Sequence, residues 1–139
     1  MNTTQAGDIV EFRFFLYCLE NNIPVSKPIS NNLPYDAIIE ANGSLLKVQI
    51  KKGYFNQSQY CFQFNTRSTS KNFSEVTTKN YIGLIDGFIT WNESIPDKFL
   101  YIPIEKATLG SMTIYIGENP RSNQNYYKDF DLSLLINKD

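Results

Sequence analysis

Three polar side chains, Asp36, Gln49 and Lys51, lie on either side of an Asn-Gly dipeptide at positions 42–43. Asn-Gly between two apolar stretches predicts a tight antiparallel hairpin, which folds residue 41 back on 44 and residue 36 back on about 49. Side chains alternate along a strand, so Gln49 and Lys51 share one face. We therefore expect a carboxylate, an amide oxygen and an ammonium group to converge at the open end of this hairpin.

This combination suits the hydrolysis of a phosphodiester. Mg²⁺ (or Mn²⁺) prefers oxygen ligands, which Asp36 and Gln49 would provide, and such an ion neutralises phosphate and lowers the pKa of water. Lys51 would orient or help deprotonate the attacking water and stabilise negative charge. The chain has no histidine. This excludes a Ser-His-Asp triad, a Cys-His pair and a His-ligated zinc site.

Glu11 lies inside the apolar run 7–20, which predicts a helix that Thr3 to Gln5 can open. A carboxylate in such a helix is costly to bury unless a metal ion or a lysine accompanies it. The structural alternative is an ion pair with Arg13 or Lys51. The run is apolar on most sides, so we expect the helix to be deeply packed or to face a partner subunit as well.

The rest of the chain predicts mostly strands. Strands are expected at 23–26, 35–41, 44–51, 60–65, 87–91 and 99–104, with 112–116 a strand or a helix start and 130–136 a short apolar element. Residues 52–59, 67–74 and 117–128 are polar and predict loops. One helix followed by strands indicates an α/β (α+β) fold rather than a Rossmann array. A length of 139 residues suits a single domain, 1–139.

Charge is unevenly distributed along the chain. Residues 47–79 carry six basic residues against one acidic residue, although the formal net charge of the whole chain is -1. A local patch for an anion is therefore possible in the middle third. Cys18 and Cys61 form no metal motif and are interpreted as buried thiols. There is no signal pattern and no apolar run of roughly 18 residues, so we expect a soluble, cytoplasmic protein without a membrane segment.

Residues 34–36 (Pro-Tyr-Asp) and 49–51 (Gln-Ile-Lys), with the helix glutamate in 7–11 (Gly-Asp-Ile-Val-Glu), resemble the signature of the PD-(D/E)XK nuclease superfamily. Segments 60–64, 85–89 and 101–104 also resemble its small members, most closely the group I intron-encoded homing endonucleases. The resemblance implies a restriction-endonuclease-like core, a central mixed β-sheet flanked by helices. It also implies that Glu11, Asp36, Gln49 and Lys51 are catalytic, with Asp36, Gln49 and Glu11 as ligands of Mg²⁺.

The resemblance further implies a site-specific double-strand DNA endonuclease that acts as a homotetramer, with a dimer as the alternative. Gln49 departs from the pattern, because an acid is usual at this position. This departure leaves a catalytically silent DNA-binding protein as an alternative. A Holliday-junction resolvase and a restriction enzyme of the same fold also stay open, because they share the site chemistry. The simplest alternative for each site residue is an ordinary polar position on a strand or turn.

Basic residues in the polar segments are candidates for contacts with DNA, because such loops suit phosphate contacts and hydrogen bonds to base edges. These candidates are Lys52, Arg67, Lys71, Lys79 and Arg121. The segments around 52–75 flank the strand that carries Lys51, where a hairpin that reads a DNA groove could rise.

Overall fold

The computed structural model describes residues 2–69 and 78–136. Its helices are α1 (Thr3–Glu20), α2 (Ser133–Ile136) and the 3-10 helices η1 (Gln57–Gln59), η2 (Ile104–Lys106) and η3 (Tyr127–Phe130). Its strands are β1 (Val25–Ser26), β2 (Ala37–Ala41), β3 (Ser44–Lys52), β4 (Tyr54–Asn56), β5 (Cys61–Asn65), β6 (Arg67–Thr69), β7 (Thr78–Asn80), β8 (Gly87–Trp91), β9 (Leu100–Pro103) and β10 (Ser111–Tyr115). This order of one long helix followed by strands is the predicted α+β arrangement.

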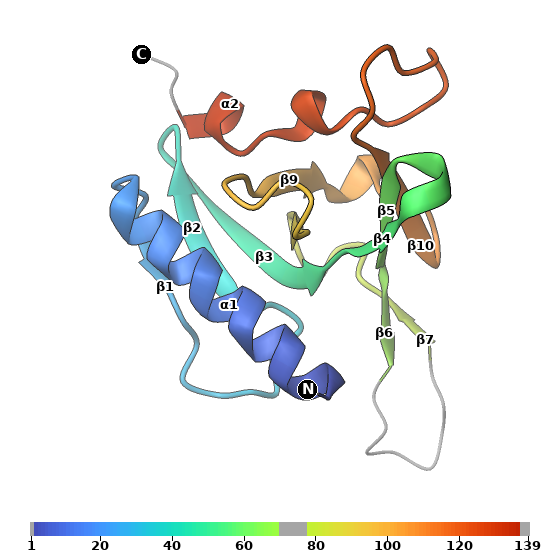
Figure 1. The fold of residues 1–139 in the computed structure, drawn as a ribbon. Coiled ribbons are helices and arrows are strands. Elements are labelled where there is room, and N and C mark those ends of the chain that lie inside the picture. The colour runs from blue at the N-terminus through green and yellow to red at the C-terminus, as the bar shows by residue number, and fades with distance from the viewer. Residues whose placement is uncertain (1, 70–77, 137–139) are drawn as a thin grey trace.

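Helix α1 lies across one face of the central sheet (Figure 1). A capping box closes its first turn: Asn2 Oδ1 accepts a hydrogen bond from the Gln5 N–H at 2.8 Å, and the Asn2 N–H donates to Gln5 Oε1 at 3.2 Å. Such a box satisfies donors that a helix start leaves unpaired. The predicted helix is confirmed, and the capping residue is one position earlier than the residues expected to open it.

The central sheet has the strand order β1-β2-β3-β8-β9. Its neighbouring strands are antiparallel except β3 and β8, which are parallel, so the sheet is mixed as predicted. The β2–β3 hairpin turns at Asn42 and Gly43, whose φ angles of 50° and 78° fit an Asn-Gly turn. Because its register pairs Ala41 with Ser44 and Ala37 with Val48, the predicted hairpin register is confirmed.

Apolar side chains form a cluster on each face of the sheet. Val10, Phe14 and Cys18 of α1 pack against Ile39, Val48 and Ile89. On the other face, Phe88 and Ile102 pack against Phe62, Phe64, Met112 and Ile114 of a second sheet of order β10-β5-β4. Burying one such side chain stabilises the fold by about 1.5–3 kcal/mol. Both cysteines, Cys18 and Cys61, are buried free thiols, as expected.

The polar segments contain more structure than predicted. The expected loop 52–59 holds strand β4 and helix η1, and the expected loop at 67–74 begins with strand β6. Every residue of β4 is exposed, and its three residues are too few to show the apolar alternation that marks a strand. Strand β4 forms because it pairs with β5, for example Tyr54 with Gln63, and the local sequence pattern does not predict this pairing.

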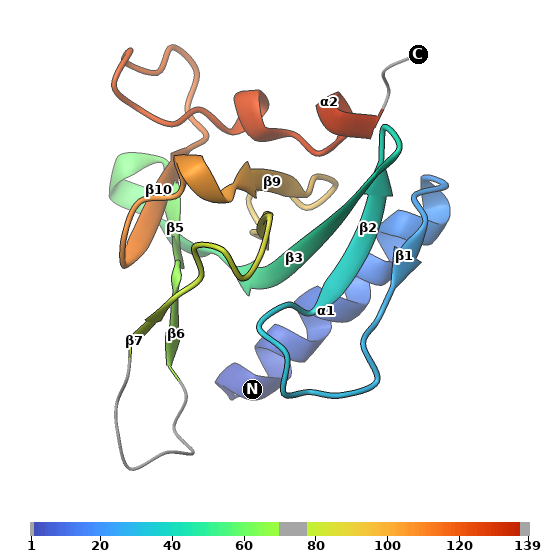
Figure 2. The ribbon, with the colours of Figure 1, turned by 180° about the vertical axis from the view of Figure 1, so that it is seen from behind.

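Strands β6 and β7 form an antiparallel ribbon in which Arg67 pairs with Asn80. We call these two strands the ribbon. It projects away from the two sheets in both views (Figures 1 and 2). Among the helices in the described ranges, none is long and apolar enough to cross a membrane.

Candidate functional site

Asp36 precedes β2 and is held against β3 by two hydrogen bonds. Its N–H donates to the Val48 carbonyl at 2.9 Å, and its Oδ2 accepts from the Ile50 N–H at 2.8 Å. Burial raises the pKa of the Asp36 carboxyl group to about 6, and the charge of Glu11 adds to this rise. The Ile50 N–H and the ammonium of Lys51 oppose it. A nearby cation would therefore stabilise the charged form of the Asp36 carboxyl group.

Lys51 lies near the end of β3 and interacts with Asp36. Burial lowers the pKa of the Lys51 ammonium, and the charge of Asp36 opposes this shift. Its Nζ donates to the Arg67 carbonyl at 3.2 Å and lies 5.4 Å from the centre of the Tyr81 ring. Arg67 begins β6 and Tyr81 directly follows β7. The base of the ribbon therefore holds this lysine in place.

Glu11 has a lysine as its partner, but neither of the two expected partners. Its Oε1 lies 2.7 Å from Nζ of Lys27, with the side chains 22% and 52% exposed respectively. Arg13 instead lies over the Trp91 ring at 4.9 Å. The expectation of an ion pair with Arg13 or Lys51 was wrong, because Lys27 reaches Glu11 from the segment between β1 and β2.

Glu11 and Asp36 line one cavity of about 360 Å³. The lining residues are Asp8, Glu11, Lys27, Pro28, Ser30, Asn31, Tyr35 and Asp36. Gln49 and Lys51 are not among them. The electrostatic interactions of Asp36 with Glu11 and Lys51 show that the structure brings these three predicted residues together.

Gln49 is half-buried on β3, in register with Phe88 of β8. Strand alternation puts its side chain on the face of Lys51. Within the described ranges, no hydrogen bond connects its amide to Asp36 or Glu11. Its place near the site follows from its position on β3, two residues before Lys51.

The donor set fits a hard divalent cation in its chemistry. It offers carboxylate oxygens from Asp36 and Glu11 with an amide oxygen from Gln49 on the neighbouring strand. The Lys27 ammonium at 2.7 Å from Glu11 already stands in for a cation there. Within residues 2–69 and 78–136, however, no group of three or more His, Cys, Asp or Glu side chains could hold a metal ion.

The predicted DNA-contacting residues have different surroundings. Lys52 forms an ion pair with Glu93 at 2.8 Å, so its charge already has a partner. Arg67 is exposed at the start of β6, and Lys79 lies in β7. The loop after β10, which carries Arg121, lies at the opposite end of the molecule from the ribbon in both views (Figures 1 and 2). Lys71 lies outside the described residues.

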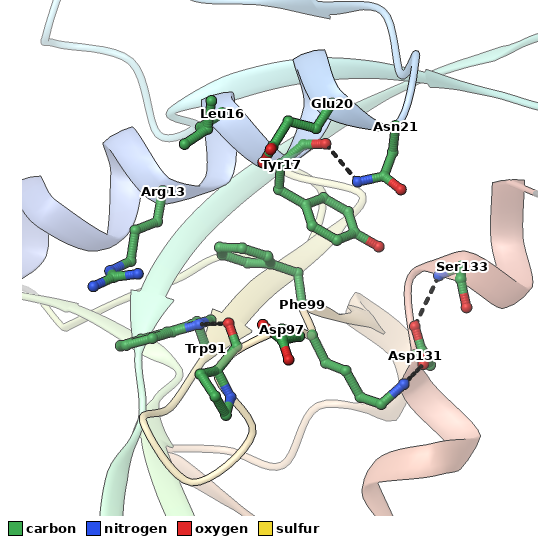
Figure 3. A pocket seen from close by; sticks show the side chains of 12 residues that line it. Arg13, Leu16, Tyr17, Glu20, Asn21, Trp91, Asp97, Phe99, Asp131 and Ser133 are labelled. Carbon is green, nitrogen blue, oxygen red and sulfur yellow. Dashed lines mark hydrogen bonds and ion pairs between the residues drawn. The ribbon is translucent and has the colours of Figure 1, made fainter.

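A larger cavity of about 530 Å³ shares no residue with the one that Glu11 and Asp36 line. Side chains of α1 border it from above and Trp91 and Phe99 from below (Figure 3). Two of its polar side chains already have partners: Lys98 contacts Asp131 at 2.8 Å, and Trp91 Nε1 donates to the Pro96 carbonyl at 3.0 Å. We therefore assign the site to the smaller cavity, where carboxylates repel each other.

Three neighbours of the site were not predicted from the sequence. Lys27 contacts Glu11 across 16 residues, and the Tyr81 ring lies near Lys51. Thr90 is paired with Lys51 in the parallel ladder, and its buried hydroxyl has no hydrogen-bond partner among the described residues. No periodicity or motif marks these residues, because each reaches the site only when distant elements pack.

Comparison with known proteins identifies the family and a similar fold. A family model described as PD-(D/E)XK endonuclease matches residues 1–133. The fold is similar to that of a bacterial homing endonuclease, I-Ssp6803I, with a TM-score of 0.75 and 20% sequence identity over 96% of this chain and 91% of that one. A search of curated proteins finds no significant match.

Proposed function

The chain belongs to the PD-(D/E)XK endonuclease family, and on that basis we propose that it is a Mg²⁺-dependent, site-specific double-strand DNA endonuclease of the homing type, encoded within an intron. One observation carries the proposal: a hydrogen bond from the Ile50 N–H at 2.8 Å holds Asp36 against β3 directly before Lys51, and Asp36 lines one cavity with Glu11 of α1. Mn²⁺ would substitute for Mg²⁺. We propose the cytoplasm as the compartment in which the enzyme meets its DNA.

In this proposal, Asp36 and Glu11 hold the divalent ion, with Gln49 as a neutral third ligand. When bound, the ion neutralises the scissile phosphate and lowers the pKa of water. Lys51 orients the attacking water and stabilises the negative charge that develops as the phosphorus–oxygen bond breaks. Its lowered pKa brings the amine closer to exchanging a proton with that water.

The ribbon supports the proposal that the substrate is a duplex. A two-stranded ribbon fits the major groove of B-form DNA, and its strands carry Arg67 and Lys79. Because the Arg67 carbonyl also accepts from Lys51, DNA bound along the ribbon would lie next to the catalytic lysine. Lys52, Lys71 and Arg121 stay candidates for further phosphate contacts.

Helix α1 supports a homo-oligomer. Phe12, Leu16 and Leu19 are 71%, 56% and 72% exposed, and their spacing of four and three residues puts them on one side of the helix. We call these three residues the outward face of α1. One small chain covers little DNA, so symmetric copies would extend the recognised site. We propose a tetramer, with a dimer as the alternative.

Cleavage of DNA in the presence of Mg²⁺ or Mn²⁺ tests the function. We expect the wild-type chain to cut a plasmid library, and Lys51→Met to lower the cleavage rate by about 10²–10⁴-fold while DNA binding persists. Lys47→Met is the matched control, because Lys47 lies on the same face of β3 and over a tyrosine ring at 5.7 Å. Cutting by Lys51→Met at the wild-type rate would refute the assignment.

Gln49 favours one other function, a catalytically silent nuclease fold that binds DNA. An amide carries no charge, and the carboxylates around it are too few for a three-acid site in the described part of the chain. If wild type binds duplex DNA yet cuts none with either ion, this second function is supported. Activity gained by Gln49→Glu would then identify the missing charge as the cause.

A further inference from the structure

Lys27 forms an ion pair with Glu11, a carboxylate that the proposed metal ion would also bind. Its Nζ lies 2.7 Å from Glu11 Oε1 and 5.6 Å from the centre of the Phe15 ring. The cavity that Glu11 and Asp36 line includes Lys27 itself. Hydrogen bonding and charge from Glu11, with smaller contributions from Asp36 and Asp8, raise the pKa of Lys27. The ammonium thus interacts with each acid of this cavity.

From this geometry we infer that Lys27 is a tethered cation that competes with the divalent ion for Glu11 and thereby sets the metal affinity of the free enzyme. The inference rests on the proposed metal-dependent function, but it names a residue outside the motif. One acid cannot pair closely with both an ammonium and a divalent ion at one oxygen without their positive charges repelling each other. Binding of the ion at Oε1 would therefore displace Lys27 from that oxygen.

The position of Lys27 makes this displacement easy. Its side chain is 52% exposed, and it lies between β1 and β2 rather than in a helix or a central strand. An exposed ion pair of this kind adds little to stability, because solvent screens it. The ammonium would move into water while Glu11 turns to the ion. The exchange substitutes a divalent ion for a single charge next to Asp36.

The test is divalent-ion binding to the DNA-free protein, measured by calorimetric titration with Mg²⁺ and Ca²⁺. Removing the competing charge in Lys27→Met should lower the dissociation constant for the divalent ion by at least about tenfold. Lys27→Arg keeps the charge and should stay within a few-fold of wild type. Lys98→Met is the matched control, since Lys98 forms a similar ion pair with Asp131 at 2.8 Å, away from this cavity, and its metal affinity should be unchanged.

An unchanged or weaker affinity in Lys27→Met overturns the inference, and so does absence of ion binding by every variant. Binding by Lys27→Met alone supports it. These outcomes are separable from the proposed function, because plasmid cleavage by the wild type is scored independently. A wild type that cuts DNA and a Lys27→Met that binds ions no better would remove the inference and leave the function standing.

Discussion

Burial of the Asp36 carboxyl group makes its charged form unfavourable in the folded protein. Its pKa is raised to about 6, chiefly by burial, so the charged form is disfavoured in the folded protein relative to the unfolded chain. Between about pH 4 and 6, the folded state then binds more protons than the unfolded state, and stability falls as pH rises. The divalent ion that we propose would offset this cost by stabilising the charged carboxylate.

We therefore expect Asp36→Asn to stabilise the metal-free protein by about 1–3 kcal/mol above pH 6, because the amide carries no buried charge. The difference should disappear near pH 4, where the wild-type carboxyl group is neutral. Thermal unfolding in a chelator at pH 4 and pH 7.5 measures both values. Added Mg²⁺ should raise the melting temperature of wild type but not of the variant. Equal stability of both proteins at pH 7.5 would contradict the burial argument.

Lys51 shows how strongly a single side chain depends on two separate elements. Its position on β3 comes from the hairpin, but its contacts come from the Arg67 carbonyl of the ribbon and from the ring of Tyr81, which directly follows the ribbon. The ribbon is therefore both a candidate reader of DNA and a support for the amine that we propose to be catalytic. Both strands are needed to hold the Lys51 amine, because Arg67 begins β6 and Tyr81 directly follows β7.

Basic residues of the ribbon should contribute phosphate contacts. We expect Arg67→Ala and Lys79→Ala each to weaken DNA binding and to reduce the slope of log affinity against log salt by about 0.9, the value for one phosphate. Fluorescence anisotropy with Ca²⁺ in place of Mg²⁺ measures binding without relying on cleavage. Lys106→Ala on η2 is an exposed control. A salt slope equal to that of wild type would exclude the ribbon as a phosphate contact.

For the whole molecule, α1 is apolar on two opposite sides. Val10, Phe14 and Cys18 are buried against the sheet, whereas the outward face of α1 is exposed. We expected this helix to be deeply packed or to face a partner subunit as well. In the single chain, one side of the helix packs against the sheet, and the outward face is exposed to solvent. An antiparallel pair of such helices about a two-fold axis would bring the exposed Arg13 of one copy towards Glu20 of the other.

Leu16→Glu should lower the oligomeric mass of the protein, since a charge at the centre of the outward face cannot be buried without a partner. Analytical ultracentrifugation measures the mass, with Leu109→Glu as a control for an equally drastic change at an exposed leucine, 77% accessible, away from α1. An unchanged mass in Leu16→Glu, or a monomeric wild type, would count against this interface.

Local sequence was enough for the hairpin. The Asn-Gly turn and the period of two along the strands determine that Asp36 comes opposite the segment with Gln49 and Lys51. The long helix and strand β8 are also local features, because each lies in a mostly apolar stretch of the sequence. The α+β class and the resemblance to the endonuclease family followed from these elements and the residues they carry.

Tertiary structure alone decided what surrounds those residues. The pairing of Glu11 with Lys27, the contacts of Lys51 with Arg67 and Tyr81, and strand β4 all depend on segments that are distant in sequence or on exposed strands without an apolar pattern. An ion pair depends on distance through space, and sequence spacing fixes that distance only within a helix, a strand or a tight turn. Asp36 and Lys51 were therefore predictable as a pair, whereas the partner of Glu11 was not.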